Sequence, residues 1–410
     1  MKYQVGIIGV GRVGLPLALS LINKGISVLG FDINEDLNRS IKMKKMPFHE
    51  PGYQEILDNQ SFECLSNFDN LGDVQNIIIT VGTPLLAHIE TDLSQLKSVM
   101  NKIIEHLQPG QNIILRSTVA PRTSEFVHLF IETHTNFKIG KDIFLTFCPE
   151  RIAEGKALEE LESLPQIIGS EDTESARRAE DLFVNLSPKV FHTNYLSAEL
   201  VKLFNNTYRY VNFSISNQFA IIAESYGVSI YEILEMANTD YPRSNIPLPG
   251  LTAGTCLRKD FGMINETNSY SDLLLNAWKI NEFIPKFLVE KALGAGSLTN
   301  TNVGVLGYSF KRDTDDTRDS LVPKLVRYIE REVPKEIYIH EPNIKEEMLD
   351  ETYINYELGE VLEKCTVLFI ALNHSVFYEK LSNILESAGK NTRIIDYWNV
   401  TGNNQIVFHT

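Results

Sequence analysis

A thiol, an ammonium group and a carboxylate stand close together in the sequence at Cys256, Lys259 and Asp260. They follow a loop rich in proline and glycine at residues 247–250. A positive neighbour favours the thiolate, which is the nucleophilic form of cysteine. The segment therefore predicts nucleophilic catalysis by Cys256, although a single cysteine near a lysine is often only structural.

The N-terminal residues carry a second chemical pattern. An apolar run at residues 3–8 leads into Gly9-Val10-Gly11-Arg12-Val13-Gly14, and residues with helical spacing follow. In a dinucleotide-binding turn, the first two glycines permit a tight turn and close approach of a pyrophosphate, and the third permits packing of the helix on the strand. The helix N-terminus adds amide donors and the positive end of its dipole.

Asp32 strengthens this interpretation. It ends the next apolar run, at residues 28–32, where a carboxylate binds a ribose diol and repels a 2′-phosphate. The pattern predicts NAD rather than NADP, and the alternative is a glycine turn with an idle aspartate. A thiolate beside a nicotinamide can capture an aldehyde, and oxidation of the hemithioacetal then gives a thioester. One such site can take an alcohol to an acid.

Two segments with small hydroxyls follow later apolar runs. Thr83 lies in residues 81–84, and Thr118 lies in residues 117–121. Both segments are expected at the edge where a doubly wound sheet binds its ligands. Their hydroxyls suit cofactor phosphates, a ribose or an ordered water, but each segment taken singly is equally compatible with an ordinary turn.

A third polar segment follows the apolar run at residues 144–147. Glu150 and Glu154 flank Arg151, and together they suit a sugar, a water and the nicotinamide ribose. The neighbouring Cys148 is interpreted as a buried core thiol without a chemical role.

Lys202 and Asn206 lie four residues apart, which places them on one face of a predicted helix. A lysine and a carboxamide that face a cleft would stabilise an oxyanion. In isolation, a solvated helix face explains the same spacing.

Alternating strands and helices in the first and last parts predict an α/β fold with two Rossmann-like, doubly wound parallel sheets. Residues 197–226 contain no proline or glycine and have apolar residues at helical spacing, so they predict a long helix. We expect an NAD-binding domain at residues 1–192, a central helical domain at 193–298 and a second Rossmann-like domain at 299–410. The predicted strands are 28–32, 76–80, 112–115 and 143–147 in the first domain, and 303–306, 336–339, 367–371 and 394–395 in the last.

Composition limits the class of protein and its partners. A chain of 410 residues is long for a single core. The formal net charge of -15 argues against nucleic acid or an anionic membrane as partner. The 4 cysteines are too scattered for a metal site or a disulfide framework. With no apolar run long enough to span a membrane and no expected signal peptide, we predict a cytoplasmic protein with a small ligand.

Taken in order, these segments resemble the nucleotide-sugar 6-dehydrogenase family, whose members oxidise UDP-glucose or UDP-N-acetylhexosamines. The resemblance covers nearly the whole chain, and its combined motifs are highly specific. The motifs are Gly9-Val10-Gly11-Arg12-Val13-Gly14-Leu15-Pro16, Ser117-Thr118-Val119-Ala120-Pro121, Pro149-Glu150-Arg151, Ala198-Glu199-Leu200-Val201-Lys202 with Asn206, Cys256 with Lys259-Asp260, and Leu306-Gly307-Tyr308-Ser309-Phe310-Lys311 leading to Asp316-Thr317-Arg318.

The resemblance implies a four-electron oxidation of a UDP-sugar C6 hydroxyl with NAD, in a homodimer formed through the central helical domain. It implies catalytic roles for Cys256 as nucleophile, for Lys202 and Asn206 in stabilising oxyanions, for Asp260 in proton handling with a water near Thr118, and for Glu150 as the base of thioester hydrolysis. It places Thr83, Glu154 and Arg318 near the cofactor. It places Arg151, Gly250, Phe310 and Lys311 near the substrate, with Arg243 reaching the substrate of the partner subunit.

The sequence departs from the family at two places. Leu251 and Ala253 make the loop before the cysteine less rich in glycine than usual. Near the C-terminus, Asp396-Tyr397-Trp398-Asn399 stands where many members have an arginine soon after the aspartate. Pro149-Glu150-Arg151 favours UDP-N-acetylmannosamine or UDP-N-acetylglucosamine as substrate, and UDP-glucose is the alternative. A two-electron dehydrogenase and a nucleotide-sugar-binding protein without activity are further alternatives.

Overall fold

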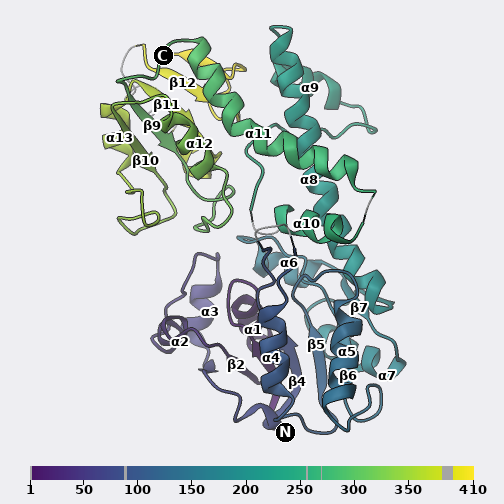
Figure 1. Cartoon of the computed structure of the whole chain (residues 1–410). Helices are drawn as coiled ribbons and strands as arrows, with labels where there is room; N and C mark the ends of the chain where they lie inside the picture. The colour runs from purple at the N-terminus through teal and green to yellow at the C-terminus, as the bar shows by residue number, and fades with distance from the viewer. Residues whose placement is uncertain (1, 87–89, 255–256, 269, 381–390) are drawn as a thin grey trace. The chain divides into compact units, whose positions relative to one another are not determined.

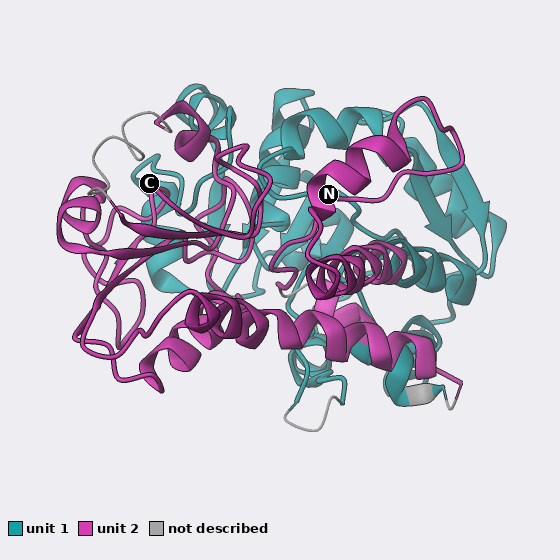
Figure 2. Ribbon diagram, turned by 90° about the horizontal axis from the view of Figure 1, so that it is seen from above, with its two compact units in different colours: residues 1–205, 262–268 teal, residues 206–261, 269–410 magenta. Residues whose placement is uncertain are grey.

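The computed structural model describes residues 2–86, 90–254, 257–268, 270–380 and 391–410 (Figure 1). The chain divides into two compact units, shown in different colours in Figure 2. Unit 1 comprises residues 1–205 and 262–268, and unit 2 comprises residues 206–261 and 269–410. The predicted nucleophile, Cys256, lies outside the described residues. The division into three domains at residues 192 and 298 stays a prediction.

Unit 1 is built on an eight-stranded sheet with the order β3-β2-β1-β4-β5-β6-β7-β8. All neighbouring strands are parallel except β6 and β7. The strand order reverses beside β1, which creates the crevice where such sheets bind ligands. The strands are β1 (Tyr3–Ile8), β2 (Val28–Phe31), β3 (Glu63–Leu65), β4 (Val74–Ile79), β5 (Asn112–Leu115), β6 (Phe144–Phe147), β7 (Gln166–Gly169) and β8 (Val190–Thr193).

Helices cover both faces of this sheet and create two apolar cores. On one face α1, α2, α3, α6 and α7 share a core with the sheet, while α4 and α5 contribute to the core on the other face. Because side chains alternate along a strand, Ile7 of β1 enters the first core and Ile8 enters the second. These helices are α1 (Gly14–Asn23), α2 (Glu35–Lys42), α3 (Tyr53–Asn59), α4 (Ser94–Ile103), α5 (Thr123–His134), α6 (Ala157–Ser163) and α7 (Thr173–Phe183), with a short 3-10 helix, η1 (Leu71–Asp73).

Four helices follow in the middle of the chain. The helix predicted at residues 197–226 is present as α8 (Tyr195–Ser225), which has 31 residues. A serine caps the next helix, α9 (Ile230–Asn238), because the Ser229 side chain accepts the backbone N–H of Glu232. The other two helices are α10 (Leu257–Thr267) and α11 (Asp272–Gly294).

The C-terminal part of unit 2 contains a five-stranded sheet with the order β10-β9-β11-β12-β13, in which only the β12–β13 pair is antiparallel. Its strands are β9 (Asn302–Leu306), β10 (Glu336–His340), β11 (Val367–Ile370), β12 (Arg393–Asp396) and β13 (Val407–His409). Its helices are α12 (Val322–Glu330), α13 (Leu358–Lys364) and α14 (Ser375–Glu379). The predicted α/β class with two largely parallel sheets is confirmed.

Candidate active site

The predicted dinucleotide turn has the geometry that its three glycines imply. Gly9 has a φ of +92°, a conformation that glycine adopts without strain. A Cβ atom on Gly14 would lie 2.1 Å from the carbonyl oxygen of Gly9, whereas a Cβ on Gly11 would meet no atom within 4 Å. Gly14 therefore permits close packing of α1, and the space beside Gly11 is open to a ligand.

Asp32 closes the turn from the end of β2. Its Oδ2 accepts the backbone N–H of Val10 at 2.7 Å, and its Oδ1 accepts that of Asn34 at 2.9 Å. The side chain of Asp32 is partly exposed. The carboxylate is thus oriented by the glycine turn itself and stands at the carboxyl edge of the sheet.

Three loops at this edge are tied to one another by threonine and serine hydroxyls. Thr80, which follows β4, donates from Oγ1 to the carbonyl of Gly9. Ser117, which follows β5, donates to the carbonyl of Val81 at 2.6 Å. Thr83 donates to the carbonyl of Thr118. The structure thus brings the glycine turn, Thr83 and Thr118 together, as the sequence analysis expected.

Arg12 and Glu154 form an ion pair, with 3.7 Å between Nε and Oε1. The Arg12 guanidinium also lies 5.1 Å from the centre of the Phe48 ring, within the range of a cation–π contact. These contacts connect the segment that follows β6 with the glycine turn.

Glu150 is buried and fully engaged. Its Oε2 lies 2.9 Å from Nε and 2.6 Å from Nη2 of Arg116, and its Oε1 accepts the backbone N–H groups of Arg151 and Ile152. The Arg151 side chain donates from Nη2 to the carbonyl of Pro165. Sequence analysis missed Arg116, because an arginine at the end of an apolar run gives no sign of which carboxylate it meets.

A polar cluster in unit 2 joins Asn206 of α8 to Lys259 and Asp260, which follow the predicted nucleophile in the sequence. Asn206 donates from Nδ2 to Oδ2 of Asp260 at 2.6 Å, and Lys259 Nζ lies 3.1 Å from Oδ1 of the same carboxylate. Asn206 and Asp260 are both buried. Lys202, one turn earlier on α8, is buried as well. Because Lys202 and Asn206 are buried, they do not form the solvated helix face that was the alternative interpretation. Charge interactions are stronger in such a buried site than in water.

The predicted substrate residues of unit 2 occupy two places. Gly250 lies in a loop whose far end, Gly254, approaches Phe310, since a Cβ on Gly254 would lie 2.3 Å from the Phe310 ring. Lys311 Nζ lies 5.6 Å from the centre of the same ring. Arg243 is exposed and lies over the ring of Tyr241.

Arg318 is predicted to lie near the cofactor. In the structure it is exposed and forms an ion pair of 2.6 Å with Asp316 in its own loop.

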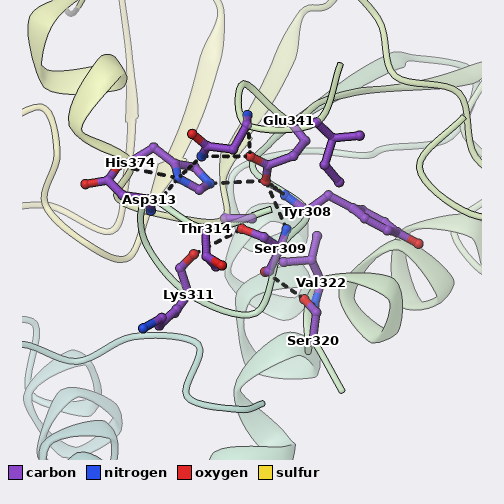
Figure 3. A network of polar contacts seen from close by, with 12 residues as sticks. Tyr308, Ser309, Lys311, Asp313, Thr314, Ser320, Val322, Glu341 and His374 are labelled. Carbon is purple, nitrogen blue, oxygen red and sulfur yellow. Dashed lines mark hydrogen bonds and ion pairs between the residues drawn. The ribbon is translucent and has the colours of Figure 1, made fainter. Parts of the chain in front are cut away.

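A buried network beneath the Lys311 loop was missed by sequence analysis (Figure 3). Glu341, which follows β10, accepts the backbone N–H groups of Tyr308 and Ser309 at 2.8 and 2.9 Å, and its Oε2 lies 3.1 Å from His374 Nε2. Asp313 donates its backbone N–H to His374 Nδ1, so the ring proton lies on Nε2. Gly307 could have indicated this network in the sequence, because it directly follows β9 as Gly9 directly follows β1. In the structure Gly307 has a φ of +96°.

Models of three consecutive domains of one family match this chain. The NAD binding domain of the UDP-glucose/GDP-mannose dehydrogenase family matches residues 3–187, its central domain matches residues 196–282, and its UDP binding domain matches residues 304–403. This chain belongs to the UDP-glucose/GDP-mannose dehydrogenase family. It is accordingly an NAD-dependent oxidoreductase that acts on a nucleotide sugar, as the resemblance predicted.

Individual relatives agree over their whole length. The UDP-N-acetyl-D-mannosamine dehydrogenase of Pyrococcus horikoshii is 32% identical over 97% of this chain and 96% of its own, and a solved structure of that enzyme has a TM-score of 0.87. The enzyme of the same name from Methanocaldococcus jannaschii is 31% identical over 97% of this chain and 92% of its own. A native structure of the Staphylococcus aureus UDP-N-acetyl-mannosamine dehydrogenase is 27% identical, covers 97% of this chain and 95% of its own, and has a TM-score of 0.83.

The residues around the glycine turn fit the family's cofactor. The open space beside Gly11 admits a pyrophosphate, no side chain caps the N-terminus of α1, and Asp32 presents a carboxylate to a ribose diol. Among the described residues, no group of three or more His, Cys, Asp or Glu side chains could hold a metal ion. No helix in the described part of the chain is long and apolar enough to cross a membrane.

Proposed function

We propose that this dehydrogenase oxidises the C6 hydroxyl of UDP-N-acetylmannosamine to a carboxylate through a thioester on Cys256. The relatives named above, all UDP-N-acetylmannosamine dehydrogenases, support this sugar. The observation that carries the chemistry is the cluster of Asn206, Lys259 and Asp260. Asn206 and Asp260 are buried, and Lys259, three residues after Cys256 in sequence, supplies the positive charge that favours a thiolate.

The reaction balances with NAD, which accepts a hydride at each of the two oxidations. The first oxidation turns the C6 alcohol into an aldehyde, and the Cys256 thiolate then attacks its carbonyl carbon to give a hemithioacetal. Loss of the second hydride leaves the thioester. Water attacks this thioester, the carbon–sulfur bond breaks, and the carboxylate and the Cys256 thiolate are released.

Lys202 and Asn206 stabilise the oxyanions of both tetrahedral species. Asp260 accepts one N–H of the Asn206 carboxamide and so orients it, and the second N–H of that group can donate to the oxyanion. We assign to Asp260 a further role in proton handling, with a water near Thr118. Glu150 is the proposed base of hydrolysis.

In unit 1, Thr83, Glu154 and the glycine turn contact the cofactor. We propose that Arg318 also contacts the cofactor. Phe310 and Lys311 contact the UDP-sugar, together with Arg151 and Gly250.

We also propose a homodimer through the central helices. Five large apolar residues on α8 are 40% to 70% exposed: Phe204, Tyr208, Ile215, Phe219 and Ile222. At about 100° per residue all five fall within an arc of about 60°. Such a stripe calls for a partner surface, and a second copy of this helix supplies a matching one. The exposed Arg243 is then the residue proposed to reach the partner's substrate.

Tyr208→Glu tests the dimer, with Tyr270→Glu as a control, because Tyr270 is exposed but lies outside α8. We expect light scattering to give a dimer for the wild type and for Tyr270→Glu, and a monomer for Tyr208→Glu. A monomeric wild-type protein would overturn the proposal. A cytoplasmic location stays a prediction.

NADH release measured on UDP-N-acetylmannosamine, UDP-N-acetylglucosamine, UDP-glucose and their galactose epimers tests the function. We expect two NADH per sugar, with the highest kcat/KM for UDP-N-acetylmannosamine. One NADH per sugar would indicate a simple alcohol dehydrogenase, and none would indicate a binding protein. A preference for UDP-glucose would correct the proposed substrate.

A further inference from the structure

The loop at residues 250–254, which leads to Cys256, is held at its first residue by a buried asparagine. Asn217 accepts the backbone N–H of Gly250 at 2.9 Å and donates to its carbonyl at 3.1 Å. Asn217 itself has no exposed surface and is fixed by Asn281 and by the hydroxyl of Tyr397. Both backbone polar groups of Gly250 are therefore bound by a single rigid side chain.

Trp398 packs directly on the same glycine. A Cβ atom on Gly250 would lie 2.1 Å from Cη2 of the indole and within 2.4 Å of two further ring carbons. Gly250 is not among the glycines with a positive φ, so its backbone would accept another residue without strain. The three atoms nearest to that Cβ all belong to the indole. The ring is fixed in turn, because its Nε1 donates to the carbonyl of Ala371 at 2.8 Å.

The far end of the loop is held by different means. Gly254 has a φ of +98° and donates its N–H to the carbonyl of Asp319 at 3.1 Å. Between the two glycines, Leu251 and Ala253 are buried in the apolar core of unit 2. The two residues that make this loop poor in glycine thus anchor it, and Trp398 closes over its first residue.

We propose that Trp398 is a positioning residue for catalysis: by packing on Gly250 it fixes the loop at residues 250–254 and so aligns Cys256 with the C6 carbon of the sugar. This inference rests on the proposed function of Cys256. Trp398 needs no contact with the substrate for this role. It acts through the backbone, since the nucleophile follows Gly254 by two residues.

A double-mutant cycle between Gly250→Ala and Trp398→Ala tests the proposal. The added methyl group collides with the indole, so Gly250→Ala alone should lower kcat/KM for the UDP-sugar about 100-fold, as expected for a misplaced reacting group. In the Trp398→Ala background the methyl group has room, and the same change should cost no more than about 2-fold. The loss should lie in kcat, and KM for NAD should not change.

Gly254→Ala and Phe310→Ala form the matched comparison. A Cβ on Gly254 also collides with an aromatic ring, but its φ of +98° strains alanine whatever the space. Phe310→Ala should therefore not restore activity to Gly254→Ala. If the losses of kcat/KM from Gly250→Ala and Trp398→Ala simply multiply in the double variant, the proposal is overturned. A rise of KM for NAD as large as the loss of kcat would overturn it as well.

A second measurement separates this proposal from the proposed function. The rate of Cys256 alkylation by iodoacetamide, followed by mass spectrometry, reports the position of the thiol without turnover, and the partly exposed Cys64 serves as internal reference. Trp398→Leu repeats the cycle if the alanine variant does not fold. We expect Gly250→Ala to change the alkylation rate of Cys256 but not that of Cys64, and Trp398→Ala or Trp398→Leu to reverse this change. That result supports the proposal even if no sugar is oxidised. An unchanged Cys256 rate overturns it.

Discussion

The carboxylate of Glu341 accepts the backbone N–H of Tyr308 at 2.8 Å, just as Asp32 accepts that of Val10 at 2.7 Å. Each carboxylate follows the second strand of its sheet, and each N–H follows a glycine with positive φ at the end of the first strand. The two differ in exposure, because Asp32 is partly exposed and Glu341 is buried against His374. Only Asp32 can bind a ribose diol, so unit 2 is not a second dinucleotide site of the same type.

Replacing Glu341 by glutamine should destabilise the protein. Oε2 of Glu341 accepts from Tyr308, Ser309 and His374, and Oε1 accepts from the backbone and side chain of Asn343. An amide keeps only one acceptor oxygen and places an N–H₂ group against the donors on the other side. We expect a loss of about 3 kcal/mol in the free energy of unfolding of unit 2, measured with urea. Glu360→Gln, at an exposed pair with Lys364, should cost less than about 1 kcal/mol. Equal losses for the two variants would contradict this account.

The stability of the protein should also depend on pH through Glu341. Burial raises the pKa of this carboxyl, but the bonds from His374, Ser309 and Tyr308 outweigh it and lower the pKa from 4.5 to about 2. Because the folded pKa is depressed, this contribution is complete above pH 4.5 and is lost as the pH falls toward 2. In acid titrations, the stability difference between wild type and Glu341→Gln should shrink over this range. A constant difference would count against the network.

Cys256→Ser should abolish formation of the acid. A serine hydroxyl is a far weaker nucleophile than a thiolate at neutral pH, so the intermediate that corresponds to the thioester does not form. The steady-state rate of acid formation should fall by at least about 1000-fold, while binding of NAD, measured by calorimetry, should not change. Cys365→Ser is the control, since that thiol is buried in an apolar core of unit 2. Full acid formation by Cys256→Ser would refute the thioester mechanism.

Asp32→Asn should weaken NAD binding and relax the choice of cofactor. The amide still occupies the turn but no longer accepts both ribose hydroxyls or repels a 2′-phosphate. We expect KM for NAD to rise about 10-fold or more, at an unchanged KM for the UDP-sugar. The ratio of kcat/KM for NAD to that for NADP should fall in the same assay. A variant that discriminates as well as the wild type would show that other residues choose the cofactor.

Glu150→Gln distinguishes a base from a structural counter-ion. If Glu150 activates water, the thioester should accumulate on Cys256 and appear as a mass increase in intact-protein spectra. If Glu150 serves only Arg116, the buried guanidinium loses its partner, and stability should fall by about 3 kcal/mol without accumulation. We expect both effects, because the carboxylate also holds the backbone of Arg151.

Residue patterns predicted the two sheets well because their strands are buried on both faces and appear as continuous apolar runs. Four short strands were missed. The edge strands β3, β8 and β13 are not buried on both faces, and β7 has only two large apolar residues, Ile167 and Ile168. At the site, the glycine turn and Asp32 were predictable because phosphate binding requires fixed spacing along the chain. Contacts such as Arg116 with Glu150 depend on a fold that brings distant loops together, and no local spacing signals them.

The contact between Gly250 and Trp398 also has a consequence for how this sequence can change over time. The atoms that a side chain at position 250 would meet first all belong to the indole, so substitutions at the two positions are not independent. Loss of the tryptophan first would open a path to alanine at position 250, whereas the reverse order passes through a crowded intermediate. Descendants of this chain should therefore change at position 398 before they change at position 250.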